Sequence, residues 1–473
     1  MKYYIDKIKR KTIVGWCFDE NDMDTPIIIE LYIDGEKIAQ ETANIYRQTL
    51  KEKNIHTSGL AGFVFRLKET VIKPQSKIEL KVKGKKYFLD HKKAYIDFLN
   101  DLITSEIFKD FDHLKRNLCI VHIGMHKTGT SSIQHNLTKM KNKNFTYFDL
   151  GPENHSIPIY SLFSHNRYEY HVHKKMGRMP CDIYNYCIRI NKRIRNNIRN
   201  NITQDTFVLS AEDIVNLSLE ELKYLQKYLH IFFKNIKIVA YVRAPFSYTV
   251  SAVQQAIKSG LNRWEPGIQK QYPEYKSKFQ KYDHVFTKEN VYLHYFAKNN
   301  LIEHDITKDF LAKNNLYVNQ ENFATHNETL ALEAVALLYI YNKYGSTPNL
   351  SAKGNLAKSK LINSLSKIGE KKFSISKKRL NPILDTHRED LMWIEKRMHM
   401  KLSDEVTYCE TKDAVASEED LYEVAKMVIH DLENLIVKKN LFISYFTKNT
   451  VANSPQDIAL LIDKLYQKIY RQL

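Results

Sequence analysis

A glycine-rich segment at residues 121–132, VHIGMHKTGTSS, carries the residue types most suited to binding an anion. Gly124 and Gly129 allow the main chain to turn tightly and to bring its N–H groups close to a negative charge. The Thr-Ser-Ser run after Gly129 begins a predicted helix, and N–H groups and hydroxyls at a helix start favour phosphate. The segment therefore predicts a phosphate-binding loop; a plain glycine turn is the alternative.

The position of the lysine distinguishes this loop from that of nucleotide triphosphatases. In those enzymes the lysine directly follows the last glycine, as GxxxxGK[ST], and reaches the β- and γ-phosphates. Here Thr130 takes that place and Lys127 lies three residues earlier. A lysine at the crown of the loop suits a group attached directly to a single phosphate. A solvated lysine without a ligand is the alternative interpretation.

Two further predicted strands also end at polar residues. Arg243 follows the strand that ends in YV, and Ser251 comes eight residues later on a predicted helix. An arginine and a hydroxyl so placed can hold a second phosphate. Ser210 and Glu212, in LSAED, follow another strand. Because ligands of parallel α/β sheets bind beyond the carboxyl ends of the strands, we expect these residues at one edge of a sheet.

The chain from residue 118 onward alternates apolar strands with helices. Four strands are predicted, at 118–123, 206–210, 236–242 and 290–295. One face of the helix predicted between the second and third strands consists of Leu222, Leu225, Leu229 and Phe232. This alternation indicates an α/β fold in which a parallel P-loop sheet is flanked by helices.

We expect four parts along the chain. Residues 1–92 have short alternating strands and an Asp34-Gly35 turn, which predict a small all-β sandwich module. A helical connector at 93–117 leads to the P-loop domain at 118–445, whose later part is mostly helical. The last part is a helical tail at 446–473.

The overall composition narrows the class of protein and the kind of partner. The chain has 473 residues, 43% of them hydrophobic, and a formal net charge of +18. It is expected to be globular, with anionic partners, although a lysine-rich solubilising surface explains the charge equally well. Five scattered cysteines without metal-ligand spacing suit free thiols in a reducing compartment. The sequence has no signal-peptide pattern and no apolar run of bilayer length, so we expect a cytoplasmic protein.

Taken in this order, the motifs resemble those of the sulfotransferases that use 3′-phosphoadenosine 5′-phosphosulfate (PAPS). HIGMHKTGTSSIQ is similar to their 5′-phosphosulfate loop, and VAYVRAPFSYTVSAVQQAIKSG is similar to their 3′-phosphate motif, with eight residues from arginine to serine. FVLSAED and the stretch from KYDHVF to DITKDFLAKNNL also resemble the bacterial glycan-sulfating branch, and the match covers about residues 118–330. The β module resembles small sandwich modules appended to bacterial glycan-modifying enzymes.

The resemblance implies a role for each residue of the two motifs. PAPS carries a 5′-phosphate bonded to the transferring sulfuryl group and a separate 3′-phosphate, so there is no γ-phosphate for a lysine to reach. Lys127 would act as a catalytic residue that stabilises the charge growing on the bridging oxygen. The residues implied for the 5′-phosphosulfate are Gly124, His126, Lys127, Thr128, Gly129, Thr130 and Ser131. Arg243 and Ser251 would hold the 3′-phosphate, and no metal is expected.

Several residues are candidates for the base that would deprotonate the acceptor. His155 is the first choice because an unperturbed histidine titrates near neutral pH, and Glu153 is the second. Glu212 and His126 stay open as alternatives, although Glu212 can equally cap a helix and His126 can simply pack against the loop. The glutamate that the family often has before an FF-type stretch finds no counterpart, because Asn144 precedes FTYFD here.

Two segments suggest an acceptor of acidic or carbohydrate character. Residues 187–202 predict an amphipathic helix with isoleucines on one face (Ile190, Ile194, Ile198 and Ile202) and basic residues on another (Lys192, Arg193, Arg195 and Arg199). The basic face suits an acidic polysaccharide or an anionic membrane surface, or is simply solvated. Trp264, next to Arg263, could stack on a sugar if exposed and belongs to the core if buried. No nucleic-acid-binding motif is present in the sequence.

These observations favour an enzyme that transfers a sulfuryl group from PAPS to a hydroxyl or amine of a carbohydrate or glycan. The first alternative is a P-loop kinase for a small molecule, which the missing lysine after the last glycine and the lack of a strand-terminal metal aspartate disfavour. The second alternative is a non-catalytic glycan- or nucleotide-binding protein on the same fold.

Overall fold

The computed structural model describes residues 1–9, 11–67, 78–85, 114–140, 144–178, 180–318, 323–324, 329–346, 351–404, 414–438 and 454–473. Most of the predicted connector at 93–117 and the start of the predicted tail at 446–473 lie outside these ranges. The chain divides into two compact units, Met1–Ile120 with Phe145–Ile236, and Val121–Asn144 with Lys237–Leu473. This division runs through the predicted 118–445 domain.

The first unit begins with two antiparallel sheets that share one hydrophobic core. The strands are β1 (Lys2–Lys9), β2 (Thr12–Phe18), β3 (Ile27–Ile33), β4 (Glu36–Ala43), β5 (Ile45–Tyr46), β6 (Leu60–Arg66) and β7 (Ile78–Val82). One sheet has the order β1-β2-β6-β5 and the other β4-β3-β7. Alternate residues of β3 are buried, and Leu31 packs in one core with Phe63 and Phe65 of β6. The predicted all-β part is therefore present as two packed sheets.

The predicted Asp-Gly turn joins β3 to β4. Asp34 has φ 55° and Gly35 has φ 91°, and the flanking residues Ile33 and Glu36 pair across the hairpin. Two successive residues with positive φ match the right-handed twist of the strands, which is why Asp-Gly is favoured there. A short helix, α1 (Gln48–Glu52), lies between β5 and β6 in the sequence.

A five-stranded parallel sheet with flanking helices confirms the α/β class. Its strands are β8 (Arg116–His122), β9 (Thr146–Tyr147), β10 (Thr206–Ser210), β11 (Phe233–Arg243) and β12 (Val291–Phe296), in the order β12-β11-β8-β10-β9. The four predicted strands correspond to β8, β10, β11 and β12, with ends that differ by up to three residues. The two-residue strand β9 was not predicted, because two residues carry no periodic pattern.

The described helices that follow α1 in the first unit are α4 (Ser156–Phe163), α5 (His171–Lys175), α6 (Pro180–Asn200) and α7 (Leu219–Phe232). Apolar side chains of α4, α6 and α7 are buried. The predicted apolar face of α7 is buried throughout, and Ser218 and Glu221 form a reciprocal capping box at its start. Three of the four isoleucines predicted for α6 are buried, but Ile202 lies beyond the helix end and is 64 % exposed. Arg116 donates to the carbonyl oxygens of Ile198 and Ile202 at that end.

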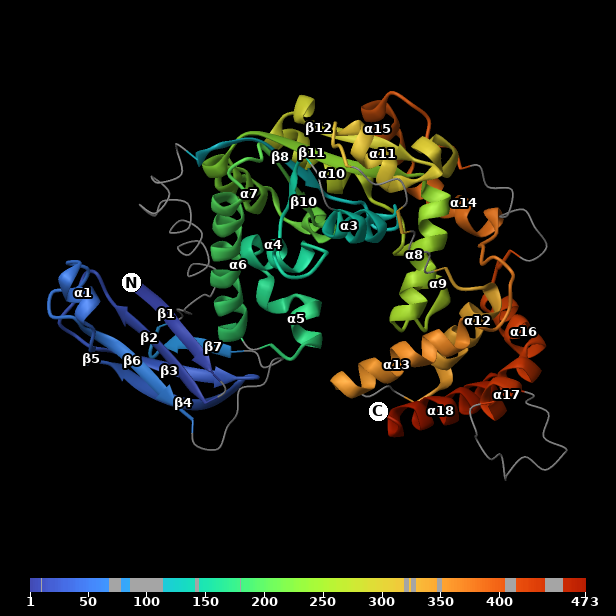
Figure 1. The fold of residues 1–473 in the computed structure, drawn as a ribbon. Helices are drawn as coiled ribbons and strands as arrows, with labels where there is room; N and C mark the ends of the chain where they lie inside the picture. The colour runs from blue at the N-terminus through green and yellow to red at the C-terminus, as the bar shows by residue number, and fades with distance from the viewer. Residues whose placement is uncertain are drawn as a thin grey trace. The chain divides into compact units, whose positions relative to one another are not determined.

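The second unit is mostly helical after β12. Its helices are α3 (Thr130–Lys139), α8 (Pro245–Ser259), α9 (Trp264–Gln269), α10 (Tyr275–Phe286), α11 (Ile306–Lys313), α12 (Leu332–Tyr344), α13 (Ala352–Leu365), α14 (Lys377–Thr386), α15 (Arg388–Met398), α16 (Glu418–Met427), α17 (Ile429–Lys438) and α18 (Pro455–Arg471). The apolar helix α12 is buried and packs against α13, α16 and α18 (Figure 1). Within the described ranges, no helix is both long enough and apolar enough to cross a bilayer.

Three cysteines of the first unit are buried free thiols. Cys17, Cys119 and Cys187 form no disulfide, in agreement with the expected free thiols. Burial raises the pKa of Cys17 to about 12 and also raises the pKa of the other two. Such thiols stay protonated at neutral pH and are unreactive. The side chains of Cys181 and Cys409 lie outside the described part of the chain.

Candidate anion-binding site

The glycine-rich loop is held at its start by β11. The N–H groups of Ile123 and Met125 donate to the carbonyl oxygens of Val239 and Tyr241, at 2.9 and 3.1 Å. The N–H of Tyr241 donates in turn to the carbonyl oxygen of Gly124 at 2.8 Å. These hydrogen bonds extend the main-chain pairing of β8 with β11 into the start of the loop. The direction in which the loop leaves the sheet is therefore fixed.

The crown of the loop uses left-handed main-chain conformations before the start of α3. Lys127 has φ 65° and Gly129 has φ 76°, and Gly129 is the residue immediately before the helix. A Cβ atom at Gly129 would approach Ile306 to 2.9 Å, so both conformation and space require glycine. Glycine offers no side chain to cap the start of α3, and the N–H of Ser132 already donates to the carbonyl oxygen of Gly129 at 3.0 Å. The N–H groups of Thr130 and Ser131 at the helix start are the natural donors to an anion.

The two threonines of the loop hold its shape through their hydroxyls. Thr128 and Thr130 both donate to the carbonyl oxygen of Met125, at 2.6 and 3.3 Å. In this arrangement the hydroxyl hydrogens stabilise the loop from within. The main-chain N–H groups are therefore the better donors to an anion at these two predicted site residues. Ser131 is exposed on the first turn of α3, and His126 is half-buried.

The ammonium group of Lys127 contacts α8. Its Nζ donates to Oε1 of Gln255 at 2.7 Å, and the lysine side chain is half-buried. Gln255 was not among the predicted site residues. It lies 128 residues from Lys127 in the sequence, and no local pattern connects the two.

Arg243 links the end of β11 to the same loop. Its Nη1 donates to the carbonyl oxygen of Lys127 at 2.8 Å, and its Nε donates to Oγ of Ser247 at 3.1 Å. The guanidinium also lies over the ring of Phe296, 5.7 Å from the ring centre. The main-chain carbonyl of Arg243 accepts a hydrogen bond from the hydroxyl of Tyr275 at 2.6 Å. The side chain and the main chain of Arg243 are thus both fixed by the protein.

One face of α8 connects the two cations. Ser247, Ser251 and Gln255 are spaced by four residues, so they lie on one side of the helix. Arg243 bonds to the first of them and Lys127 to the last, over about 12 Å of helix at 1.5 Å per residue. Ser251 is half-buried between them. Three predicted site residues, Lys127, Arg243 and Ser251, are therefore brought together in the second unit.

Asp404 closes the N-terminus of α8. Its carboxylate accepts the N–H groups of Phe246 and Ser247, at 2.8 and 3.1 Å. Burial raises the pKa of this carboxyl, while its hydrogen bonds to Ser247 and Phe246 and the positive charge of Arg243 act in the opposite direction. Asp404 was also missed by sequence reasoning, because it lies 158 residues from Phe246.

His155, the first candidate for the base, is a core residue of the first unit. It is 1 % exposed, and its ring stacks on Tyr147 with ring centres 4.5 Å apart. Its Nδ1 accepts the N–H of Ser210 at 3.2 Å. Burial lowers its pKa to about 3, so the ring is neutral at physiological pH. Its placement gives it no access to a bulky acceptor, and the structure offers no support for the predicted base role.

The two glutamates among the candidates lie nearer the surface. Glu153 is exposed, and its main-chain carbonyl accepts the hydroxyl of Tyr147 at 2.5 Å. Glu212 is half-buried directly after β10, where its carboxylate accepts a hydrogen bond from Asn154 at 3.2 Å. Of the first-unit candidates, Glu212 combines a carboxylate held by a neighbour with a place at the carboxyl end of a sheet strand.

The residues predicted to contact an acceptor differ in exposure. Trp264 is 2 % exposed and packs edge-on against Tyr339. It is therefore a core residue, and its ring is not exposed for stacking on a sugar. Arg263, just before it, is exposed. On α6, Lys192, Arg193 and Arg199 are exposed and Arg195 is half-buried, as expected for a basic face.

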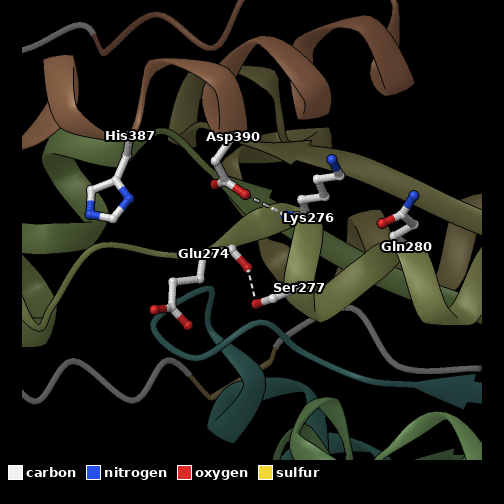
Figure 2. A pocket seen from close by; sticks show the side chains of 6 residues that line it. All are labelled: Glu274, Lys276, Ser277, Gln280, His387 and Asp390. Carbon is white, nitrogen blue, oxygen red and sulfur yellow. Dashed lines mark hydrogen bonds between the residues drawn. The ribbon is translucent and has the colours of Figure 1, made fainter.

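A separate open depression of about 440 Å³ lies beside the start of α10 (Figure 2). Its lining consists of Glu274, Lys276, Ser277, Gln280, His387 and Asp390. Asp390 accepts the N–H groups of Tyr275 and Lys276, at 2.9 and 2.7 Å, and so caps α10. The ring of His387 stacks on Tyr272 at 4.0 Å between ring centres. These contacts serve to join α10 to α15, and no sequence-predicted site residue lines the depression.

The described residues contain no group of three or more histidine, cysteine, aspartate or glutamate side chains that could hold a metal ion. Comparisons with protein-family models, with curated proteins and with solved structures give no match to this chain. The site is therefore interpreted from its own geometry: two cations held along one helix face, next to a glycine loop that begins another helix.

Proposed function

We propose that this protein transfers the sulfuryl group of PAPS to a hydroxyl or amine of a carbohydrate. The observation that supports this most is the pair formed by Lys127 and Arg243. Both cations contact the polar face of α8, with Ser251 between them, and Arg243 donates to the carbonyl oxygen of Lys127. Two separate cations held a short distance apart suit a nucleotide with two separate phosphates.

The donor groups at the site match the chemistry of such a nucleotide. The ammonium of Lys127 and the first N–H groups of α3 suit the 5′-phosphosulfate, because a helix start and a point charge both favour an anion. Arg243 presents a planar guanidinium, which suits the oxygens of the 3′-phosphate, and Ser251 can donate its hydroxyl. Gly129 leaves the approach to α3 free of a side-chain cap.

When bound, PAPS supplies an activated sulfuryl group whose leaving group is a phosphate. Lys127 stabilises the negative charge that develops on the bridging oxygen, and the first N–H groups of α3 add to this. Arg243 and Ser251 fix the position of the nucleotide, since such transfers depend chiefly on orientation and on charge stabilisation. Among the first-unit candidates for the base that would deprotonate the acceptor, we prefer Glu212 to His155, because Glu212 is half-buried and His155 is enclosed.

The acceptor is proposed to be an acidic polysaccharide or another glycan. The formal net charge of +18 and the exposed basic residues of α6 favour an acidic polymer over a neutral one. An anionic membrane surface would be attracted by the same charges. The proposed acceptor therefore predicts that sulfation of acidic polysaccharides weakens as salt is raised, because salt screens exposed charges.

Calorimetric titration of the purified protein separates this proposal from its alternatives. The probes are adenosine 3′,5′-bisphosphate and ATP with magnesium. We expect binding of the bisphosphate and little or none of ATP. Preference for ATP with magnesium would favour a kinase instead. Lack of binding to both nucleotides, together with binding to a glycan, would favour a non-catalytic glycan-binding protein.

A further inference from the structure

The ammonium group of Lys127 is held by an acceptor on α8. Its Nζ donates to Oε1 of Gln255 at 2.7 Å. Lysine has four rotatable side-chain bonds and therefore many orientations in the absence of a partner. Here the main chain of Lys127 is also fixed, because its carbonyl accepts from Arg243 at 2.8 Å. Both ends of this lysine are thus tied to the β11–α8 segment.

Gln255 is suited to hold a cation without neutralising it. Its side-chain oxygen is uncharged, so it accepts an ammonium hydrogen without cancelling the positive charge of the lysine. A carboxylate at this position would hold the lysine more strongly but would place a negative charge beside the phosphate. The face of α8 that carries Gln255 also carries Ser251 and Ser247. The position of the Lys127 ammonium is therefore fixed by the same helix that carries the proposed 3′-phosphate residue Ser251.

We infer that Gln255 is a positioning residue that keeps the ammonium of Lys127 directed along the polar face of α8 before the nucleotide arrives; this inference rests on the proposed function. Preorganisation of this kind raises the rate of the transfer step more than it raises nucleotide affinity, because the charge on the bridging oxygen develops in the transition state. Gln255 acts only through Lys127 in this account.

The test combines two variants with a readout that does not depend on activity. Gln255→Met keeps the length of the side chain but removes the oxygen acceptor, and Gln255→Glu keeps an oxygen acceptor. Gln269→Met, at an exposed glutamine of α9, is the matched control. The acetylation rate of Lys127 is measured by mass spectrometry in the protein without nucleotide. Turnover with PAPS and affinity for adenosine 3′,5′-bisphosphate are measured in parallel.

We expect Lys127 to be acetylated faster in Gln255→Met than in the wild type or in Gln269→Met, and to stay protected in Gln255→Glu. For Gln255→Met, kcat should fall roughly tenfold or more, the equivalent of one hydrogen bond to a charged group, with a much smaller change in bisphosphate affinity. For Gln255→Glu, bisphosphate affinity should fall because of charge repulsion.

Equal acetylation of Lys127 in the wild type and in Gln255→Met would overturn the inference. So would an unchanged kcat in Gln255→Met, or an equal loss of kcat, affinity and thermal stability, which would indicate a merely structural role. A wild-type protein that neither binds the bisphosphate nor uses PAPS would refute the proposed function instead. In that case the acetylation rates still decide whether Gln255 holds Lys127.

Discussion

The guanidinium of Arg243 donates to the main-chain carbonyl oxygen of Lys127 at 2.8 Å, which joins the carboxyl end of β11 to the crown of the glycine loop. The same guanidinium donates to Ser247 on α8, and Lys127 reaches Gln255 two helical turns further along. The two cations therefore form one connected arrangement, and a change in either should alter the position of the other.

Removal of the lysine charge tests its proposed role in the reaction. Lys127→Ala should lower transfer by about 100- to 1,000-fold, the typical effect of losing one charge-stabilising donor. The melting temperature should change little, because the lysine side chain is only half-buried. The measurement is incorporation of radiolabelled sulfate from PAPS into the polysaccharide that the wild type sulfates best.

Lys139→Ala, at an exposed lysine in the last turn of α3, is the control for that experiment and should retain full transfer. Undiminished turnover by Lys127→Ala would contradict the assignment of Lys127 to the bridging oxygen.

Replacement of the last loop glycine should destabilise the protein. Gly129→Ala forces a Cβ atom to within 2.9 Å of Ile306 and places alanine at φ 76°. The expected loss is about 1–3 kcal/mol in the free energy of unfolding, measured by urea denaturation. The double variant Gly129→Ala with Ile306→Ala should lose less than the sum of the two single variants, because it removes the clash. Strict additivity would show that the clash contributes nothing.

Asp404 should influence stability and nucleotide affinity in opposite directions. Asp404→Ala removes the acceptor for two N–H groups at the start of α8, which should cost about 1 kcal/mol in the free energy of unfolding. It also removes a negative charge close to Arg243, so affinity for adenosine 3′,5′-bisphosphate should rise. Asp385→Ala, at an exposed aspartate of α14, should change neither quantity. Weaker bisphosphate binding by Asp404→Ala would contradict this account.

The buried imidazole of His155 should make stability depend on pH. Its pKa is about 3 in the folded protein and 6.5 in the ordinary, solvated state. Between these values the unfolded chain binds a proton that the folded protein does not, so stability is full above pH 6.5 and falls as the pH is lowered towards 3. Each such group contributes at most about 1.4 kcal/mol per pH unit.

His155→Gln keeps an acceptor for the N–H of Ser210 and removes this titration. Urea denaturation at a series of pH values between 7.5 and 5 should therefore show a shallower slope in the variant than in the wild type. His173 and His294, whose pKa values burial lowers to about 4, account for part of the remaining slope. Identical slopes would contradict the burial of a neutral His155. Abolished transfer with unchanged stability would restore His155 as the base.

The main elements of the sheet could be predicted because their sequence signals are local. The region of β8 contains the largely apolar run LCIVHI, which Gly124 follows, and β11 contains the apolar run IVAYV, which Arg243 follows. The positions of Lys127, Arg243 and Ser251 relative to strand ends followed from this order. Short elements such as β9 gave no signal, because two residues cannot show a period.

The contacts that complete the site could not be predicted, because they join distant parts of the chain. The spacing of four between Ser251 and Gln255 is visible in the sequence, but its link to Lys127 is not. Burial is equally hidden: His155 follows a polar loop in the sequence yet lies in the core, and Trp264 follows an exposed arginine yet is 2 % exposed. The residue types of His155 and Trp264 indicated a possible chemical role, but tertiary packing determines whether such side chains are accessible to a ligand.

The most direct test of the central claim is calorimetry with adenosine 3′,5′-bisphosphate and adenosine 5′-monophosphate on the wild type and on Arg243→Ala. We predict that the wild type binds the bisphosphate at least about tenfold more tightly than it binds the monophosphate, the equivalent of a hydrogen bond to a charged group. We predict that this difference in affinity disappears in Arg243→Ala. A margin that survives the loss of Arg243, or a wild type that does not distinguish the two nucleotides, would contradict the assignment of Arg243 to the 3′-phosphate and of Lys127 to the opposite end.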